Sequence, residues 1–266
     1  FPVDVGFHLQ GFDRGHARDV FGEEGLVAGA EHELLVELLL EQGRDEEADE
    51  GDGADDGVTL AGDVVRPAGA GKFPAVINFG PYHKDGRGGR LDVDAANRHF
   101  AARGYAALSV DMRGLGNSGS SNPEPFAPQE AKDGHDLVEW VARQPWCDGN
   151  VGMWGVSYPG ITALATAATR PPHLKAIVPI HASADLHRGA IGLGGCQAGF
   201  WMRADWGPRM AAYNLLPPLL PDADGRWAQV WADHLEGNAP WLSSWIDHRH
   251  FDDYWKSRVA AVDRIE

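Results

Sequence analysis

The chain has 266 residues, of which 43% are hydrophobic and 23% charged, a composition typical of a globular domain with a substantial buried core. Its net charge of −16 argues against a nucleic-acid-binding protein, because such a protein needs a basic surface for the phosphates. The only cysteines, Cys147 and Cys196, exclude a disulfide framework and a cysteine-rich metal site, and no apolar run is long enough to cross a membrane.

Most of the negative charge lies in residues 1–57, which hold 17 acidic residues against three arginines. We expect one short amphipathic helix over residues 31–41, whereas the acidic, glycine-rich stretch 45–57 is typical of a disordered linker. Residues 1–57 are therefore predicted to lie outside the folded core. No signal peptide is visible, so a cytoplasmic location is the expectation.

Between residues 58 and 180, apolar runs rich in strand-forming residues alternate with segments of helical spacing. The predicted strands cover residues 58–65, 75–79, 105–110, 151–155 and 174–180. The predicted helices cover residues 91–103, 130–144 and 161–170. This alternation predicts an α/β fold with a largely parallel sheet over residues 58–180.

After residue 180 the alternation stops. Residues 181–266 carry seven of the ten tryptophans and two helix-like segments, at 226–236 and 251–262. No apolar strand of the earlier kind occurs among them. We therefore expect residues 181–266 to form a helical cap inserted into the sheet domain.

The clearest chemical signal is the segment GVSYPG at residues 155–160, between a predicted strand and a predicted helix. Small residues allow a tight turn there, and such a turn holds a serine, here Ser157, in a strained conformation with its hydroxyl exposed. The backbone N–H of Tyr158 then faces the oxyanion that develops during acyl transfer. The second glycine is Gly160, one position later than in the general G-x-S-x-G pattern. An ordinary serine in a turn is the alternative, but the flanking strand and helix favour a nucleophile.

A second glycine motif points to a different class of protein. Residues 114–119, GLGNSG, follow a predicted strand and satisfy the G-x-G-x-x-G pattern of dinucleotide-binding sites. In such a site the last glycine leads into a helix whose N-terminus holds the pyrophosphate. Here residues 120–125, SSNPEP, have the composition of a loop, so nucleotide binding is disfavoured.

Several further blocks occur in a characteristic order along the chain. They are DDGVTLAGDVVRP at 55–67, NFGPYHKD at 78–85, GYAALSVDMRGLGNSG at 104–119, HDLVEW at 135–140, QPWCDGNVGMW at 144–154 and LKAIVPIHASADLHRGAIGLGG at 174–195. With GVSYPG they make the chain, over about residues 55–266, resemble the serine hydrolases grouped with X-Pro dipeptidyl-peptidase and cocaine esterase. Alpha-amino-acid ester hydrolases and some acylases belong to the same group.

The resemblance implies an α/β-hydrolase fold and hydrolysis of an ester or amide through an acyl-Ser157 intermediate. It implies that the N–H of Tyr158 and the phenol of Tyr82 form the oxyanion hole; a turn tyrosine packed on the sheet is the alternative for Tyr82. It implies no metal and no organic cofactor. The expected partner is a small ester, an amide or a short X-Pro peptide, with no nucleic acid and no membrane, and the oligomeric state stays open.

A loop after the third predicted strand also matches the family, in its pattern D-x-R-G…S-x-G. We expect a buried Asp–Arg pair to shape this loop, and we expect Cys147 to be a packing residue. The matching positions are Asp111, Arg113, Gly114, Ser118 and Gly119.

A serine hydroxyl becomes nucleophilic only when an oriented base takes its proton. The histidines after Ser157, none of which lies where that base is expected, are His173, His181, His187, His234, His248 and His250. In the family the cap is followed by a strand leading to the catalytic aspartate, a histidine loop and a β-rich domain. We therefore expect the catalytic Asp and His, the last strands of the sheet and that domain to be absent from these residues. A non-catalytic fragment acting as a binding scaffold is the alternative function.

Overall fold

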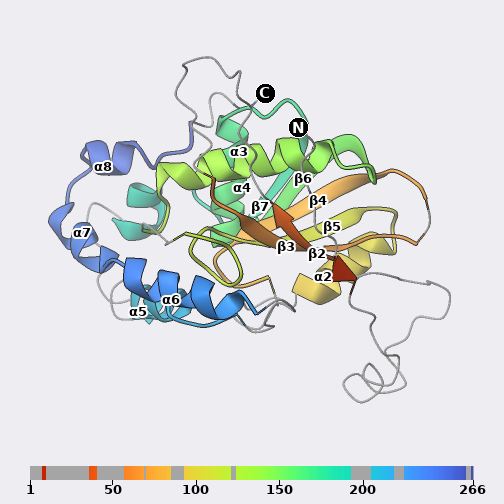
Figure 1. Ribbon diagram of the computed structural model, residues 1–266. Helices are drawn as coiled ribbons and strands as arrows, with labels where there is room; N and C mark the ends of the chain where they lie inside the picture. The colour runs from red at the N-terminus through yellow and green to blue at the C-terminus, as the bar shows by residue number, and fades with distance from the viewer. Residues whose placement is uncertain are drawn as a thin grey trace.

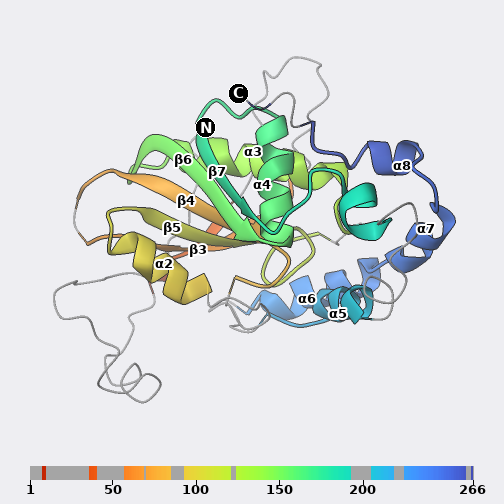
Figure 2. The same ribbon diagram turned by 180° about the vertical axis from the view of Figure 1, so that it is seen from behind.

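A computed structural model places a mixed sheet at the centre of the molecule, with helices on both faces (Figure 1 and Figure 2). Helices α3 (Pro128–Ala142) and α4 (Tyr158–Ala168) cover one face, and helix α2 (Val93–Ala101) covers the other. This layered arrangement confirms the predicted α/β fold. The structure describes residues 8–9, 36–40, 57–68, 70–84, 93–120, 124–192, 205–218, 225–261 and 265.

The sheet has seven strands in the order β1-β2-β3-β5-β4-β6-β7. Their bounds are β1 His8–Leu9, β2 Val36–Leu40, β3 Leu60–Val65, β4 Phe73–Gly80, β5 Ala106–Asp111, β6 Cys147–Val156 and β7 Leu174–Ile180. The pairs β1–β2, β2–β3 and β3–β5 are antiparallel, whereas β5, β4, β6 and β7 run parallel. Each of the five predicted strands and three predicted helices overlaps an observed element.

The central strands form the core because their side chains are apolar on both faces of the sheet. Ile77 on β4, Leu108 on β5 and Met153 on β6 are all buried, as expected for parallel strands covered by helices on either side. Small side chains on α4, such as those of Ala163 and Ala167, are buried as well. They let the helix approach β6 and β7 closely, and this approach positions the start of α4 at the end of β6.

The order of the strands creates a switch point beside β4. The chain passes from β4 to β5 on one side of it, and then to β6 on the other side. In parallel α/β sheets, ligands bind beyond the carboxyl ends of the strands where the winding reverses. Here those ends are Gly80 on β4 and Val156 on β6.

The described elements that follow β7 are all helical. They are the π-helix η2 (His187–Ile191) and the helices α5 (Gly207–Asn214), α6 (Trp227–Gly237), α7 (Trp241–Asp247) and α8 (Asp253–Lys256). Trp241, Trp245 and Trp255 are buried in the hydrophobic core and anchor this region to the rest of the molecule. The division into a core at 58–180 and a cap at 181–266 stays a prediction.

The expected helix over residues 31–41 is wrong. Residues 36–40 form β2, which pairs with β3 from Val36 opposite Val64 to Leu40 opposite Leu60. The run VELLL suits a strand as well as a helix, and the open edge of β3 offers it backbone hydrogen-bonding partners. Consequently β1 and β2 belong to the sheet, contrary to the expectation that residues 1–57 lie outside the core. Residues 45–56 of the predicted linker lie outside the described residues.

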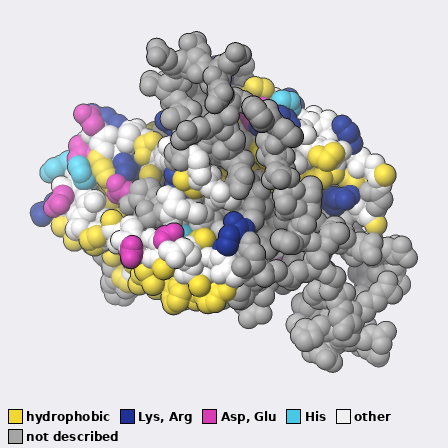
Figure 3. Space-filling view, in the orientation of Figure 1, with side chains coloured by type: hydrophobic (Ala, Val, Ile, Leu, Met, Phe, Trp, Pro, Cys, Tyr) yellow, Lys and Arg dark blue, Asp and Glu magenta, His cyan; other side chains and the backbone are white. Residues whose placement is uncertain are grey.

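Two groups of exposed apolar side chains occur among the described residues, apart from the single residues Tyr105 and Ile246. Val178 and Ile180 on the edge strand β7 are 54% and 43% exposed. Figure 3 shows a second group along the lower edge of the molecule, over α5 and α6, where Leu215, Leu216 and Leu235 are exposed. None of the described helices is long and apolar enough to span a membrane.

Candidate active site

Ser157 occupies a strained turn between β6 and α4. Its backbone has φ 65° and ψ −119°, values that cost a non-glycine residue roughly 1–3 kcal/mol. Two hydrogen bonds hold the turn: the N–H of Ser157 donates to the carbonyl of Ile180 at 2.8 Å, and its own carbonyl accepts from Gly160 at 3.0 Å. This is the backbone geometry predicted for a nucleophile elbow.

The glycines of GVSYPG allow the close approach of the two arms of the turn. A Cβ on Gly155 would overlap Pro159, and a Cβ on Gly160 would lie 2.8 Å from the carbonyl oxygen of Gly155. Pro159 fits at the second helical position, where no N–H is needed for the helix. The shift of the second glycine from 159 to 160 is therefore compatible with the elbow.

Ser157 lines a cavity of about 580 Å³, a size typical of small-molecule sites. The cavity lies at the switch point, because Gly80 at the end of β4 and Val156 at the end of β6 also line it. Its opposite wall comes from the region after β7, through Trp206 and Tyr213. The site is thus enclosed between the sheet and the helices that follow it.

Tyr158 contributes two different features to this site. As the first residue of α4, it has a backbone N–H with no carbonyl partner within the helix, so this N–H is suited to receive an oxyanion. Its side chain is buried, and its hydroxyl donates to Oε1 of Glu130 at 2.7 Å and accepts from the N–H of Phe126 at 2.7 Å. Burial raises the pKa of Glu130 to about 8 and holds the pKa of Tyr158 well above its usual value.

Stacked aromatic rings form one wall of the cavity. The ring of Phe126 lies 4.1 Å from that of Tyr158, at an interplanar angle of 22°. The ring of Trp206 also stacks on that of Phe126, at 5.7 Å and an interplanar angle of 7°. All three residues line the cavity, which therefore presents flat apolar surfaces to a ligand.

Tyr82 follows β4 and lines the same cavity as Ser157. Its ring makes edge-to-face contacts with Tyr158, at 6.5 Å and 85°, and with Tyr213, at 6.2 Å and 71°. Within the described part of the chain, its hydroxyl has no hydrogen-bond partner. The structure thus brings Ser157, Tyr158 and Tyr82 to one cavity, while their catalytic roles stay predictions.

No histidine among the described residues is hydrogen-bonded to Ser157. His181 lines the cavity but is exposed. Three further histidines contact other groups: His173 pairs with Glu139 at 2.8 Å, His248 with Asp252 at 2.6 Å, and His234 with the carbonyl of Ser118 at 2.7 Å. The expectation that the catalytic base lies elsewhere stays a prediction.

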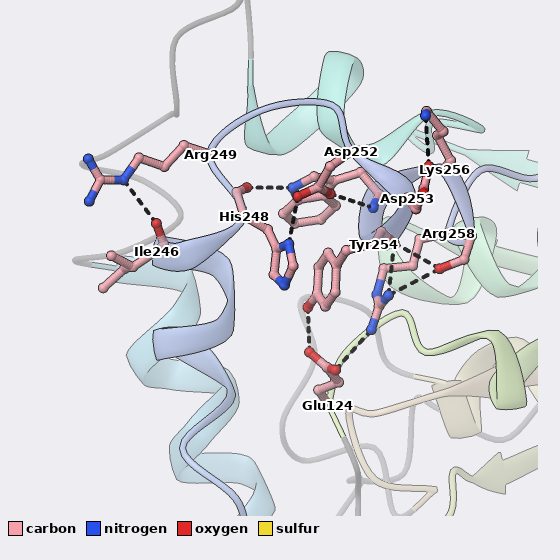
Figure 4. Close-up of polar contacts among 11 residues, drawn as sticks. Glu124, Ile246, His248, Arg249, Asp252, Asp253, Tyr254, Lys256 and Arg258 are labelled. Atoms are coloured by element: carbon pink, nitrogen blue, oxygen red, sulfur yellow. Dashed lines mark hydrogen bonds and ion pairs between the residues drawn. The ribbon is translucent and has the colours of Figure 1, made fainter.

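Figure 4 shows that the Asp–His pair at the start of α8 belongs to a separate network. His248 stacks on the ring of Tyr254 at 4.1 Å, and the hydroxyl of Tyr254 donates to Glu124. Arg258 lies 3.5 Å from the centre of that ring and pairs with Glu124 at 2.9 Å. None of these side chains lines the cavity of Ser157. Through Glu124, the network anchors α8 to the loop before α3.

The loop after β5 has a structural role. The carboxylate of Asp111 accepts from the N–H groups of Lys84, at 2.6 Å, and Asn117, at 3.2 Å. Arg113 forms an ion pair with Asp133 on α3 through two contacts of 2.6 Å. The sequence did not suggest Asp133 as its partner. The GLGNSG motif does not lead directly into a helix, since α3 begins only at Pro128, so it lacks the geometry of a dinucleotide site.

Two polar residues beside Tyr82 were missed by the sequence analysis. Lys84 lines the cavity and pairs with Asp63 on β3 at 3.0 Å, with both side chains buried. His83 also lines the cavity, and its Nε2 lies 3.4 Å from the carbonyl oxygen of Tyr213. Both belong to the block NFGPYHKD, but nothing in that block identifies partners so distant in sequence. Across the described residues, no group of three or more His, Cys, Asp or Glu side chains is placed to hold a metal ion.

Comparison with known proteins agrees with this geometry. Residues 56–265 match the family model of X-Pro dipeptidyl-peptidase (S15 family). A cocaine esterase from Rhodococcus sp. (strain MB1 Bresler) is 42% identical over 236 residues, an alignment that covers 79% of this chain and 40% of that protein. The chain therefore spans about two fifths of the length of this relative.

Two solved structures share the fold. A CocE/NonD family hydrolase from Staphylococcus aureus superposes with a TM-score of 0.63 at 24% identity, covering 91% of this chain and 43% of that one. An alpha-amino acid ester hydrolase gives a TM-score of 0.55 at 24% identity, covering 80% and 39%. These similarities support the α/β-hydrolase architecture.

Proposed function

Because the chain belongs to the X-Pro dipeptidyl-peptidase (S15) family, we propose that it is the nucleophile-bearing part of a serine hydrolase that cleaves an ester or amide. The observation that carries the proposal is the positive φ of Ser157, directly after the carboxyl end of the parallel strand β6. Ser157 lines a cavity that Tyr82 and Tyr158 also line. Neither an ordinary turn serine nor a packing tyrosine requires this combination.

In the proposed reaction, Ser157 Oγ forms a bond to the carbonyl carbon of the substrate and loses its proton to a base. The carbonyl electron pair moves to the oxygen, and the N–H of Tyr158 and the hydroxyl of Tyr82 donate to this oxyanion. Collapse of the intermediate expels the alcohol or amine, which takes up a proton, and water then releases the acid from Ser157. We place the base outside the described residues, because no described histidine is hydrogen-bonded to Ser157.

We propose an ester with a flat, apolar acyl group as the first substrate class. The stacked rings of Tyr158, Phe126 and Trp206 offer such a group a matching surface. An X-Pro peptide carries a free ammonium group that needs a carboxylate in the site. The carboxylate that lines the cavity in the described part of the chain is Asp205, and it is already paired with Arg209. This pairing favours an ester over an X-Pro peptide.

Labelling with a fluorophosphonate tests the proposal, because this probe reacts with an activated serine. We expect labelling of a protein that contains both this chain and the base, its loss in Ser157→Ala, and its retention in Ser257→Ala, which alters an exposed serine just after α8. Hydrolysis of p-nitrophenyl benzoate and of glycyl-prolyl-p-nitroanilide by the same protein without the probe then compares the two substrate classes. Preference for the anilide would contradict the ester assignment.

The second candidate function is a non-catalytic binding scaffold. The observation that favours it is the same lack of a described histidine on Ser157. Folded protein that resists labelling would support it, because Ser157 would then have no working base. Labelling of Ser157 would exclude it.

A further inference from the structure

The ring of Tyr82 contacts two other tyrosines. Its contact with Tyr158 from α4 is edge-to-face at 6.5 Å and 85°, and its contact with Tyr213 from α5 is at 6.2 Å and 71°. Its hydroxyl makes no hydrogen bond to another described residue. The direction of this phenol therefore depends, within the described structure, on the packing of its ring.

Tyr213 also contacts His83, the residue that follows Tyr82. The ring of His83 lies 6.2 Å from that of Tyr213, and His83 Nε2 lies 3.4 Å from the carbonyl oxygen of Tyr213, to which it donates in the tautomer protonated there. The backbone of His83 has φ 65°, an uncommon value for a non-glycine residue. Two consecutive residues after β4 thus contact one residue of α5.

We propose that Tyr213 is a positioning residue for the phenol of Tyr82, so that helix α5 sets the geometry of the oxyanion hole. The inference rests on the proposed acyl transfer at Ser157. An oxyanion donor acts only when it lies about 2.7–3.1 Å from the developing charge. A ring with fewer packing contacts can turn away from that point. The ring of Tyr213 also lines the cavity, and its contact with the ring of Tyr82 restricts this movement.

The test needs a readout that does not depend on the general base. A cysteine provides one, because its thiolate is nucleophilic without a partner base. In the Ser157→Cys chain, attack on p-nitrophenyl acetate forms a C–S bond and moves the carbonyl electron pair onto oxygen. Collapse breaks the C–O bond and releases p-nitrophenolate. Alkylation by iodoacetamide instead displaces iodide and creates no oxyanion.

The ratio of the acylation rate to the alkylation rate, followed by peptide mass spectrometry at position 157, therefore reports on oxyanion stabilisation alone. We expect Tyr82→Phe to lower this ratio by about 10²-fold, the loss of one oxyanion donor. Tyr213→Leu should lower it about tenfold, whereas Tyr213→Phe, which keeps the ring, should preserve it. Leu215→Ala, one residue beyond α5 and exposed, is the matched control and should leave the ratio unchanged.

The decisive variant combines Tyr213→Leu with Tyr82→Phe. If Tyr213 acts through Tyr82, the double variant is no worse than Tyr82→Phe alone. Multiplied effects, or an unchanged ratio in Tyr213→Leu, would overturn the positioning role while leaving the proposed hydrolase intact. An unchanged ratio in Tyr82→Phe would remove Tyr82 from the oxyanion hole and the positioning role with it. An alkylation rate equal to that of the Ser157→Cys chain shows in each variant that position 157 is equally accessible.

Discussion

The hydroxyl of Tyr158 donates a 2.7 Å hydrogen bond to Oε1 of Glu130, and both side chains are buried. Tyr158 directly follows Ser157, so the carboxyl group that anchors this ring also anchors the elbow. The N–H of Phe126 donates to the same oxygen at 2.8 Å and thereby joins the aromatic wall to the network. One acid of α3 thus supports both the turn and the wall of the candidate site.

This acid makes stability depend on pH. Burial raises the pKa of Glu130 from 4.5 to about 8, so the folded chain binds one proton more than the unfolded chain within that window. Its contribution to the free energy of unfolding is therefore full below about pH 4.5 and declines as the pH rises towards 8. Glu130→Gln keeps an acceptor for Tyr158 and removes the titration. Urea unfolding at pH 5, 6.5 and 8 should give a smaller decline for this variant, and an equal decline would contradict the assignment.

His234 on α6 should make stability depend on pH in the opposite direction. It is buried, its Nε2 lies 2.7 Å from the carbonyl of Ser118, and burial lowers its pKa below 6.5. The unfolded chain therefore binds more protons just below pH 6.5, and stability is lost as the pH falls through that region. Hydrogen exchange of residues 227–237, corrected for intrinsic rates, should quicken between pH 7 and 5.5. His234→Gln should remove most of this acid dependence; a similar increase in the variant would assign it to another group.

The elbow should not tolerate a side chain at Gly155. A Cβ there would overlap Pro159, whereas a Cβ on Gly152 of the same strand would lie 3.4 Å from the carbonyl oxygen of Ala176, an ordinary contact. We expect Gly155→Ala to lower the free energy of unfolding by about 1–3 kcal/mol, the range for overpacking, and to reduce labelling of Ser157. Gly152→Ala is the control. Equal unfolding midpoints for the two variants in urea would show that the turn relaxes without cost.

Two ion pairs allow a comparison of buried and exposed charge. Arg113 and Asp133 are 8% and 2% exposed and make two contacts of 2.6 Å. Removing one partner leaves an uncompensated buried charge, so Asp133→Ala should cost about 3–5 kcal/mol. The pair of Arg98 and Asp94 on α2 is 48% and 39% exposed, and Asp94→Ala should cost below about 1 kcal/mol. Chemical denaturation measures both, and similar losses would contradict the structural role of Arg113.

Local sequence accounts for much of the fold and for the core of the site. The strands over 73–80 and 106–111 follow from apolar runs, and the turn at Ser157 follows from the steric needs of Gly155 and Gly160. These features depend on neighbouring residues, whose spacing is visible in the sequence. The run at 36–40 was different, since its composition suits a helix or a strand, and pairing with β3 decided between them.

The alternation of strands and helices, the turn at Ser157 and the resemblance to the family could all be predicted from the amino-acid sequence. The partners of these residues became known from the folded structure. Glu130 meets Tyr158 across 28 positions, and His83 meets Tyr213 across 130. Local propensities act over a few residues, whereas such contacts arise because the sheet and the packed helices bring distant segments together. The candidate nucleophile Ser157 is therefore predictable from the sequence, but the groups that position it and its proposed oxyanion donors are visible only in the fold.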